Sequence, residues 1–111
     1  MLSVLLLACP AIANSTTGVP RIVDGDSLEI DGVKIRLHGI DAPERNQTCG
    51  TDPNRWDCGR RATRALSEMI DRAPVTCHER DVDRYGRIVA VCTVGSVLIN
   101  SRMVAEGWAV A

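Results

Sequence analysis

Alternating apolar and polar residues follow residue 20, a pattern typical of half-buried strands. The apolar positions of this stretch are Val23, Leu28, Ile30, Val33, Ile35 and Leu37. Asp31-Gly32 interrupts the pattern and supplies the positive φ values that a two-residue turn requires. We therefore expect residues 27–30 and 33–40 to form a hairpin, in which Ile35 and Leu37 face the core and Arg36 faces the other way.

A second hairpin is predicted from the segments VTCHER (75–80) and RIVAVCTV (87–94), which flank the turn DRYG. If this turn is centred between residues 84 and 85, antiparallel pairing places Val82 opposite Arg87 and Cys77 opposite Cys92. Directly opposed positions have Cα atoms about 4.5 to 5.5 Å apart, a separation that a disulfide tolerates. The register therefore predicts a disulfide between Cys77 and Cys92.

Two further cysteines, Cys49 and Cys58, lie in the polar segment 45–58, RNQTCGTDPNRWDC. This composition indicates a surface loop, which the second cysteine pair would close. A zinc site is the alternative use of four cysteines, but the chain has no CxxC pair.

Helical spacing appears in residues 59–71, where the apolar positions are Ala62, Ala65, Leu66, Met69 and Ile70. The arginines of this segment fall outside the apolar stripe, and we expect them to be solvated. Asp57 is the expected N-cap, and Pro74 ends the segment. A shorter helix is expected at 101–106, with Asn100 as its cap and Gly107 as its stop.

The first thirteen residues, MLSVLLLACPAIA, carry no charge and end in a small-x-small pattern. We interpret 1–13 as a signal peptide, 14–20 as a linker and 21–111 as the folded domain. A buried first strand is the weaker alternative because Pro10 interrupts the apolar run. A lipoprotein cleavage box with Cys9 lipidated is a second alternative. The apolar run is too short to span a bilayer. We expect a secreted or periplasmic protein, in which the four remaining cysteines form disulfides.

Composition and charge limit the number of domains and the ways in which the chain could bind a polyanion. A length of 111 residues with 45% hydrophobic residues suits one domain. The formal net charge is -1, which argues against coating nucleic acid or anionic membrane by bulk electrostatics. The basic residues are all arginine except Lys34, and arginine forms bidentate pairs with phosphate. Any contact with a polyanion must therefore be local.

Carboxylates gather near predicted strand ends. Asp24, Asp31 and Asp83 fit the common role of turn formers. Asp26 and Asp41 fit it less well, because the first hairpin brings them side by side, where two unpaired carboxylates repel. A hard divalent cation would resolve that repulsion.

Two arginines near the predicted carboxylates suggest a phosphate-binding site. Arg36 projects from the strand that leads to Asp41, and Arg87 follows the turn of the second hairpin. Two guanidinium groups beside a divalent ion would clamp a phosphoryl group and stabilise charge on its phosphorus. Glu44 would act as general base or orient the attacking water. From spacing alone, a structural salt-bridge network remains an equal alternative.

Several motifs in a fixed order reduce that ambiguity. The stretches VDGDSLEI, IRLHGIDAPE, DRYGRIVAVC and MVAEGWA together resemble the staphylococcal nuclease (thermonuclease) family, specifically its exported, cysteine-containing bacterial members. The resemblance implies a mainly β fold, a five-stranded OB-type barrel with flanking short helices. It also implies hydrolysis of DNA and RNA phosphodiesters with Ca²⁺ as cofactor. We expect a monomer without a stable protein partner.

The same resemblance assigns roles to individual residues. Asp26 and Asp41 match the calcium-binding carboxylates, and Ala42 matches a position that offers its backbone carbonyl. Arg36 and Arg87 match the phosphate-binding arginines.

Two further positions match, and two features depart from the family. Glu44 matches the glutamate usually assigned as base, and Tyr85 matches a nucleotide-pocket tyrosine. The sequence stops after GWAVA, where the family continues into tyrosines and a last helix. The chain is also not basic, which predicts weak binding and a shallow salt dependence. A non-catalytic OB-type binding module is the alternative function, but such domains tend to lose the acidic and arginine positions kept here.

Overall fold

The computed structural model describes residues 14–111. The predicted signal peptide at 1–13 and the alternative of a lipidated Cys9 lie outside the described residues. No helix within the described part is long and apolar enough to cross a membrane.

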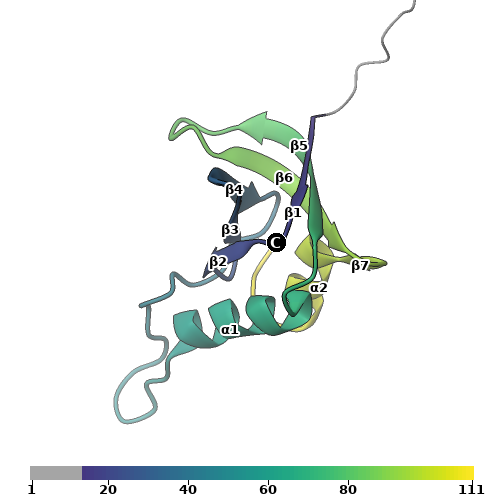
Figure 1. Ribbon diagram of the computed structural model, residues 1–111. Helices are drawn as coiled ribbons and strands as arrows, with labels where there is room; N and C mark the ends of the chain where they lie inside the picture. The colour runs from purple at the N-terminus through teal and green to yellow at the C-terminus, as the bar shows by residue number, and fades with distance from the viewer. Residues whose placement is uncertain (1–13) are drawn as a thin grey trace, which may run out of the picture.

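Strands dominate the molecule, and two helices pack against them (Figure 1). The elements in chain order are β1 (Ser15–Gly18), β2 (Arg21–Asp24), β3 (Ser27–Ile30), β4 (Val33–Leu37), α1 (Cys58–Ile70), β5 (Val75–Val82), β6 (Ile88–Val94), β7 (Val97–Leu98) and α2 (Ile99–Ala105). Both predicted hairpins are present, as β3–β4 and β5–β6. Asp31 and Gly32 have positive φ values at the first turn, as expected.

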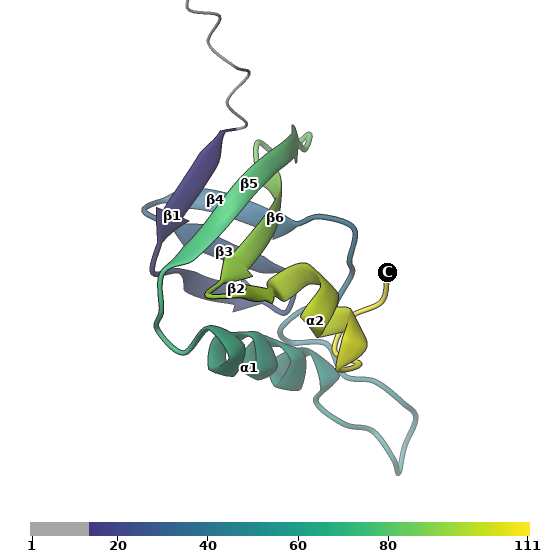
Figure 2. The same ribbon diagram turned by 90° about the vertical axis from the view of Figure 1, so that its right-hand side faces the viewer.

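The strands form one curled sheet in the order β1-β5-β6-β4-β3-β2, and β7 pairs with β6. Neighbouring strands are antiparallel except β4 and β6, which run parallel. Curling brings β1 close to β3. The approach is so tight that a Cβ on Gly18 would lie 2.7 Å from Cγ2 of Ile30. Figure 2 shows this half-barrel with α1 lying across one end. The prediction of a mainly β, OB-like fold with short helices is confirmed.

The core fills the inside of the curled sheet. Its largest fully buried side chains include Leu28, Ile35, Leu37, Leu66 and Met103. Ile35 and Leu37 face inward as predicted, and α1 buries Leu66 with its neighbours on the predicted stripe. The core therefore joins β3, β4 and both helices into one unit.

Both disulfides are confirmed. Cys77 pairs with Cys92 directly across β5 and β6, and Cys49 pairs with Cys58 at the start of α1.

The predicted linker at 14–20 is wrong, because residues 15–18 form β1 and pair with β5. This strand is polar and is followed by Pro20, so it carries no strong local signal. Its partner is the edge of β5, whose backbone groups would otherwise lack strand partners.

Two local details, the register near the β5–β6 turn and the start of α1, also differ from the sequence-based expectations. Val82 pairs with Ile88 and not with Arg87, because a β-bulge between Glu79 and Asp81 shifts the register near the turn. Asp57 precedes α1 but makes no side-chain capping hydrogen bond.

Asn100, the expected cap of the last helix, lies inside α2, which begins at Ile99. Its buried side chain accepts a hydrogen bond from the amide of Cys92 and donates to the carbonyls of His38 and Ala90. The amide side chain thus satisfies buried backbone groups of two neighbouring segments, which outweighs a local capping role.

Candidate active site

The turn between β2 and β3 positions the first carboxylate. A Cβ at Gly25 would lie 2.9 Å from Cβ of Ala62 and 3.0 Å from Cβ of Ala42. The turn therefore packs directly on α1 and on the segment after β4. Asp26, the next residue, is buried in consequence.

Asp26 is held from two sides. Its Oδ2 accepts a hydrogen bond of 2.8 Å from the amide of Ala42 and lies 3.2 Å from Nη1 of Arg36. Burial raises the pKa of Asp26 above its ordinary value, although the Ala42 amide and the Arg36 charge act in the opposite direction. The negative charges of Asp24 and Asp41 raise it further. Asp41 thus acts on Asp26 as a neighbouring negative charge, as expected, but the two carboxylates are not unpaired, because Arg36 contacts both.

Arg36 joins the two predicted metal-binding carboxylates. Its guanidinium contacts Asp26 through Nη1 and Oδ1 of Asp41 through Nη2, at 3.4 Å. A further hydrogen bond of 3.3 Å from Nη1 to the carbonyl of Leu37 fixes the side chain against its own strand. Asp41 itself is exposed, while its backbone pairs with Val110. The arrangement leaves one carboxylate accessible and one sheltered.

The parallel pairing of β4 and β6 brings the second arginine to this place. Ile35 of β4 lies opposite Ile88, the first residue of β6. Arg87, which directly precedes Ile88, therefore lies beside the strand that carries Arg36. Arg36, Asp41 and Arg87 line one hollow of about 400 Å³. Two arginines predicted from separate hairpins thus share one site.

Asp83 orients Arg87. Its carboxylate accepts hydrogen bonds from the amide and Nε of Arg87, at 2.9 and 2.8 Å, and from the amide of Tyr85 at 2.9 Å. Desolvation on its own raises the pKa of Asp83, but these hydrogen bonds outweigh it and hold the pKa below its ordinary value. Asp83 is therefore a turn former, as expected, and also an anchor for the guanidinium.

The other predicted residues lie around this hollow. Glu44 is exposed between β4 and α1, forms no ion pair within residues 14–111, and does not line the hollow. Tyr85 is 70% exposed at the tip of the β5–β6 hairpin, where the guanidinium groups of Arg84 and Arg87 lie over its ring. Ala42 is buried and directs its amide at Asp26. The metal-binding role of the Ala42 carbonyl and the base role of Glu44 stay predictions.

Sequence reasoning missed the part that Asp24 takes. Its Oδ1 accepts a hydrogen bond of 2.7 Å from the amide of Arg45, and its Oδ2 accepts one of 3.3 Å from Oγ of Ser27. Asp24 therefore ties the segment after Asp41 to the β2–β3 turn. The available signal was its position two residues before Asp26 in the DGD stretch.

Comparison with known proteins shows the family of this chain. The family model described as staphylococcal nuclease homologue matches residues 34–111. The chain belongs to this family. The matched range spans Arg36, Asp41, Glu44, Tyr85 and Arg87, whereas Asp26 lies before it.

Curated relatives of this nuclease family extend the similarity over most of the chain. Protein ParB of Escherichia coli is 39% identical over 92% of this chain and 52% of its own length. Micrococcal nuclease of Shigella flexneri is 36% identical over 79% of this chain and 48% of its own length. An uncharacterized endonuclease of Haemophilus influenzae is 33% identical over 95% of this chain and 56% of its own length. The chain thus spans about half the length of these relatives.

Asp26 and Asp41 supply carboxylate oxygens to this nuclease-family site. Asp26 and Asp41 both reach the Arg36 guanidinium, and the pKa of Asp26 is raised partly by its acidic neighbours. Oxygen donors of this kind suit Ca²⁺ or Mg²⁺. Within residues 14–111, no group of three or more His, Cys, Asp or Glu side chains is arranged to hold a metal. A metal site at these residues therefore stays a prediction, and the positive charge that the structure places beside both carboxylates is that of Arg36.

Proposed function

We propose that this chain is a secreted or periplasmic nuclease domain that hydrolyses phosphodiester bonds of DNA and RNA with Ca²⁺ as cofactor. The observation that carries the proposal is the contact of Arg36 with both Asp26 and Asp41, beside a hollow that Arg36, Asp41 and Arg87 line. Relatives named micrococcal nuclease and endonuclease support the same activity.

Arg36 and Arg87 would bind the two non-bridging oxygens of the scissile phosphate. Each guanidinium is pre-oriented by a carboxylate, Arg87 by Asp83 and Arg36 by Asp26. The positive charges are therefore already in place when negative charge develops on the phosphorus oxygens, and the arginine side chains lose little rotamer freedom on binding. A donor of this kind contributes about 10²- to 10³-fold to the rate.

Glu44 would accept the proton of the attacking water. The water oxygen forms the new bond to phosphorus, the ester oxygen on the opposite side departs with the bonding electron pair, and a proton from solvent neutralises it. Glu44 is exposed and free of ion pairs within the described residues, so its carboxylate can turn toward the phosphate.

Asp26 and Asp41, with the Ala42 carbonyl, would hold Ca²⁺, which when bound supplies charge that polarises the phosphoryl group. Tyr85, at the hairpin tip, would pack against the nucleoside next to the cleaved bond. Two disulfides are compatible with an oxidising compartment and so support export.

The test is cleavage of plasmid DNA and of single-stranded DNA and RNA by the purified protein, with Ca²⁺, with Mg²⁺ and with chelator. We expect cleavage with Ca²⁺ and none with chelator. Arg36→Ala and Glu44→Gln should each lower kcat by about 10²-fold or more while circular dichroism shows an intact fold.

Lys34→Ala is the matched control for Arg36→Ala, because Lys34 is an exposed cation on the same strand without an ion pair in the described part of the chain. It should cleave at the wild-type rate. The absence of cleavage under every metal condition, by a protein shown to be folded, would contradict the proposed activity.

A further inference from the structure

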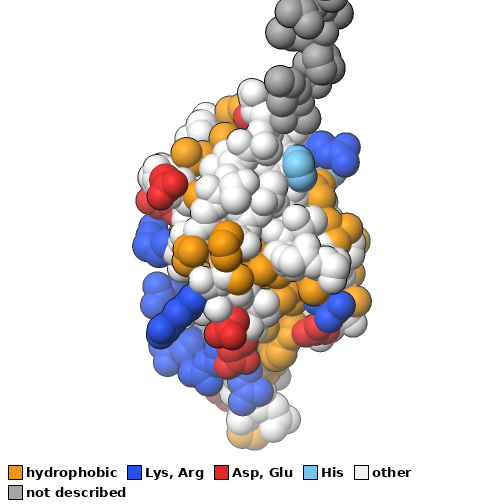
Figure 3. Space-filling view, turned by 45° about the vertical axis from the view of Figure 1, so that its right-hand side comes forward, with side chains coloured by type: hydrophobic (Ala, Val, Ile, Leu, Met, Phe, Trp, Pro, Cys, Tyr) orange, Lys and Arg blue, Asp and Glu red, His pale blue; other side chains and the backbone are white. Residues whose placement is uncertain are grey.

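A second hollow, separate from the site above, lies between α1 and the segment that follows Glu44. Its volume is about 600 Å³. Its polar lining consists of Arg45, Asn46, Arg60, Thr63, Arg64 and Ser67. We call this hollow the basic groove. Figure 3 shows Lys and Arg side chains gathered over the end of the molecule that α1 occupies.

The three arginines of the basic groove form no ion pair within residues 14–111. Arg60 and Arg64 are four residues apart on α1 and therefore point to the same side, one turn apart. Like charges at this spacing destabilise a helix. The pair is thus not explained by helix stability.

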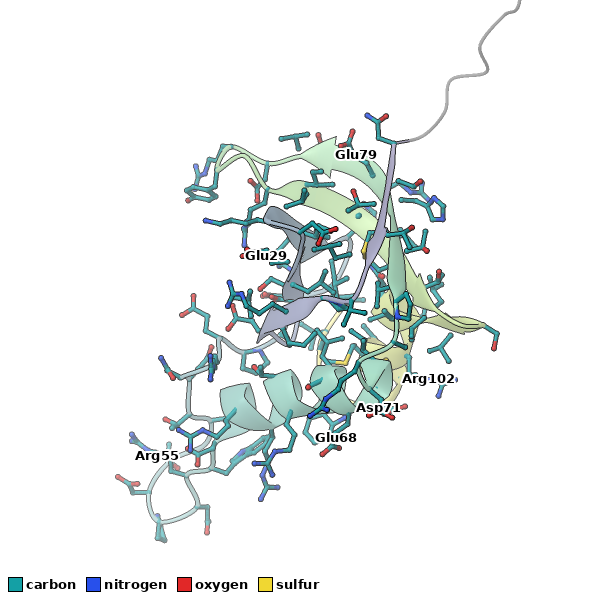
Figure 4. All side chains as sticks on the ribbon, in the orientation of Figure 1. Glu29, Arg55, Glu68, Asp71, Glu79 and Arg102 are labelled. Carbon is teal, nitrogen blue, oxygen red and sulfur yellow. A yellow bond between two sulfur atoms is a disulfide. The ribbon has the colours of Figure 1, made fainter. Side chains whose placement is uncertain are left out.

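The charge order along α1 is also opposite to the one that helix electrostatics favours. The first turn contains Arg60 and Arg61 and no acidic residue, although a helix N-terminus is stabilised by negative charge. Figure 4 places Glu68 and Asp71 at the other end of the helix. Asp57, at the N-cap position, supplies one negative charge there, and Arg61 lies over the Trp56 ring. Arg60 and Arg64 have no such partner among the ion pairs of residues 14–111, and like charges left unpaired on one helix face are expected at a functional surface.

The basic groove is connected rigidly to the proposed active site. Arg45 directly follows Glu44, and Asp24 holds the amide of Arg45. On the helix side, Gly59 packs so closely under Glu44 that a Cβ there would overlap the Glu44 carbonyl. The amide of Gly59 donates to the carbonyl of Gln47. The groove therefore begins one residue beyond the proposed base.

We infer that the basic groove binds the phosphodiester backbone of the substrate strand beyond the bond that is cleaved. The inference rests on the proposed function, because it places the groove on the path of a strand leaving the Arg36–Arg87 site. From Arg60 to Ser67 the helix extends about 10 Å, enough to contact neighbouring phosphates of an extended single strand. Hydroxyl and amide groups of Thr63, Ser67 and Asn46 supply hydrogen bonds between the guanidinium groups.

The clustering of arginines in the basic groove agrees with the low net charge of the chain. A chain of net charge -1 has no long-range attraction for polyanions, so a strand must be held by a concentrated cluster. The groove supplies three of the 13 basic residues in one place.

The experiment measures equilibrium binding of a fluorescent 20-nucleotide single-stranded DNA by anisotropy, in chelator, across a series of salt concentrations. The test variant is Arg60→Gln/Arg64→Gln, which keeps helix propensity close to that of arginine. The control is Arg72→Gln/Arg80→Gln, which removes the same charge outside the groove. Arg45→Gln, in a loop, gives a reading that helix stability cannot affect.

We expect the test variant to bind about tenfold more weakly and its slope of log K against log salt to be shallower by about 1.4, since each neutralised phosphate of a single strand contributes about 0.7. Arg45→Gln should reduce the slope by about half that amount, and the control should match wild type. Equal affinity and slope in all variants would overturn the inference, as would an equal loss in the control. An equal loss of binding to an acidic polysaccharide such as polygalacturonate would overturn the assignment to nucleic acid. A wild-type protein that binds this DNA but cleaves none with Ca²⁺ would contradict the proposed function alone.

Discussion

Replacing Gly59 by alanine tests the contact that joins α1 to the segment bearing Glu44. An added Cβ would overlap the Glu44 carbonyl oxygen and lie 2.7 Å from the carbonyl carbon, whereas ordinary contact begins at 3.4 Å. The carbonyl carbon alone would require a retreat of about 0.7 Å, and the overlap with the oxygen requires more. Backbone lies on both sides of this contact, so no side chain can rotate away to make room.

The expected cost follows from two opposing effects. In an ordinary helix, Gly→Ala stabilises by about 0.8 to 1 kcal/mol. Overpacking of a well-packed contact costs about 1 to 3 kcal/mol and occasionally more; overlap with backbone belongs at the upper end. We expect a net loss of about 2 kcal/mol, which lowers Tm by about 8 to 16 °C for a domain of this size. Displacement of Glu44 by nearly 1 Å should also lower kcat by about 10²-fold.

Thermal unfolding followed by circular dichroism, and Ca²⁺-dependent cleavage well below the variant's Tm, measure the two effects. Gly32→Ala is the control: its φ is +80° and nothing lies within 4 Å of the added Cβ. It should lose about 1 kcal/mol through backbone strain alone and keep its kcat. A Gly59→Ala protein with a raised Tm and full activity would refute the reasoning.

Three other variants follow from the described contacts. Asp83→Asn should lower Tm at pH 7. The difference from wild type should begin to shrink near pH 4, the ordinary pKa of Asp, and close as the pH falls through the lowered pKa of the folded state; a difference independent of pH would contradict this. Asn100→Ala should cost about 2 to 3 kcal/mol in urea unfolding, since the amide of Cys92 and the carbonyl of His38 lose their hydrogen bonds to this side chain; an unchanged midpoint would count against it. Cys77→Ala/Cys92→Ala should cost about 3 kcal/mol for a loop of 15 residues, and equal urea midpoints for oxidised wild type and variant would disprove that contribution.

Elements with local signals were predictable from the sequence. The hairpin at Asp31-Gly32 has a turn that only certain residues adopt, and α1 has a clear apolar stripe ending at Ile70. The disulfide Cys77–Cys92 followed from register, even though the bulge near Asp81 was not foreseen. The bulge lies between the cysteines and the turn, so the outer register was unaffected by the error near the tip.

Features that depend on distant partners were not predictable. β1 exists because the edge of β5 is available, and nothing in residues 15–18 themselves indicates this pairing. In the same way, Asp24 looked like a turn residue until its contact with Arg45 was seen. Asn100 looked like a helix cap, and only the folded protein brings Cys92 to its side chain. Polar side chains with several possible local uses are therefore the least predictable.

The parallel pairing of β4 with β6 has a consequence for the order in which the protein acquires its chemistry. Ile35 and Ile88 meet only after the chain has closed a loop of roughly 50 residues, a step whose entropy cost delays it relative to hairpin formation. Neither hairpin holds both arginines. A nascent or refolding chain with two complete hairpins would thus remain inert, and cleavage would begin with the long-range contact that unites them. Under the proposed function, catalytic competence would then mark the end of folding.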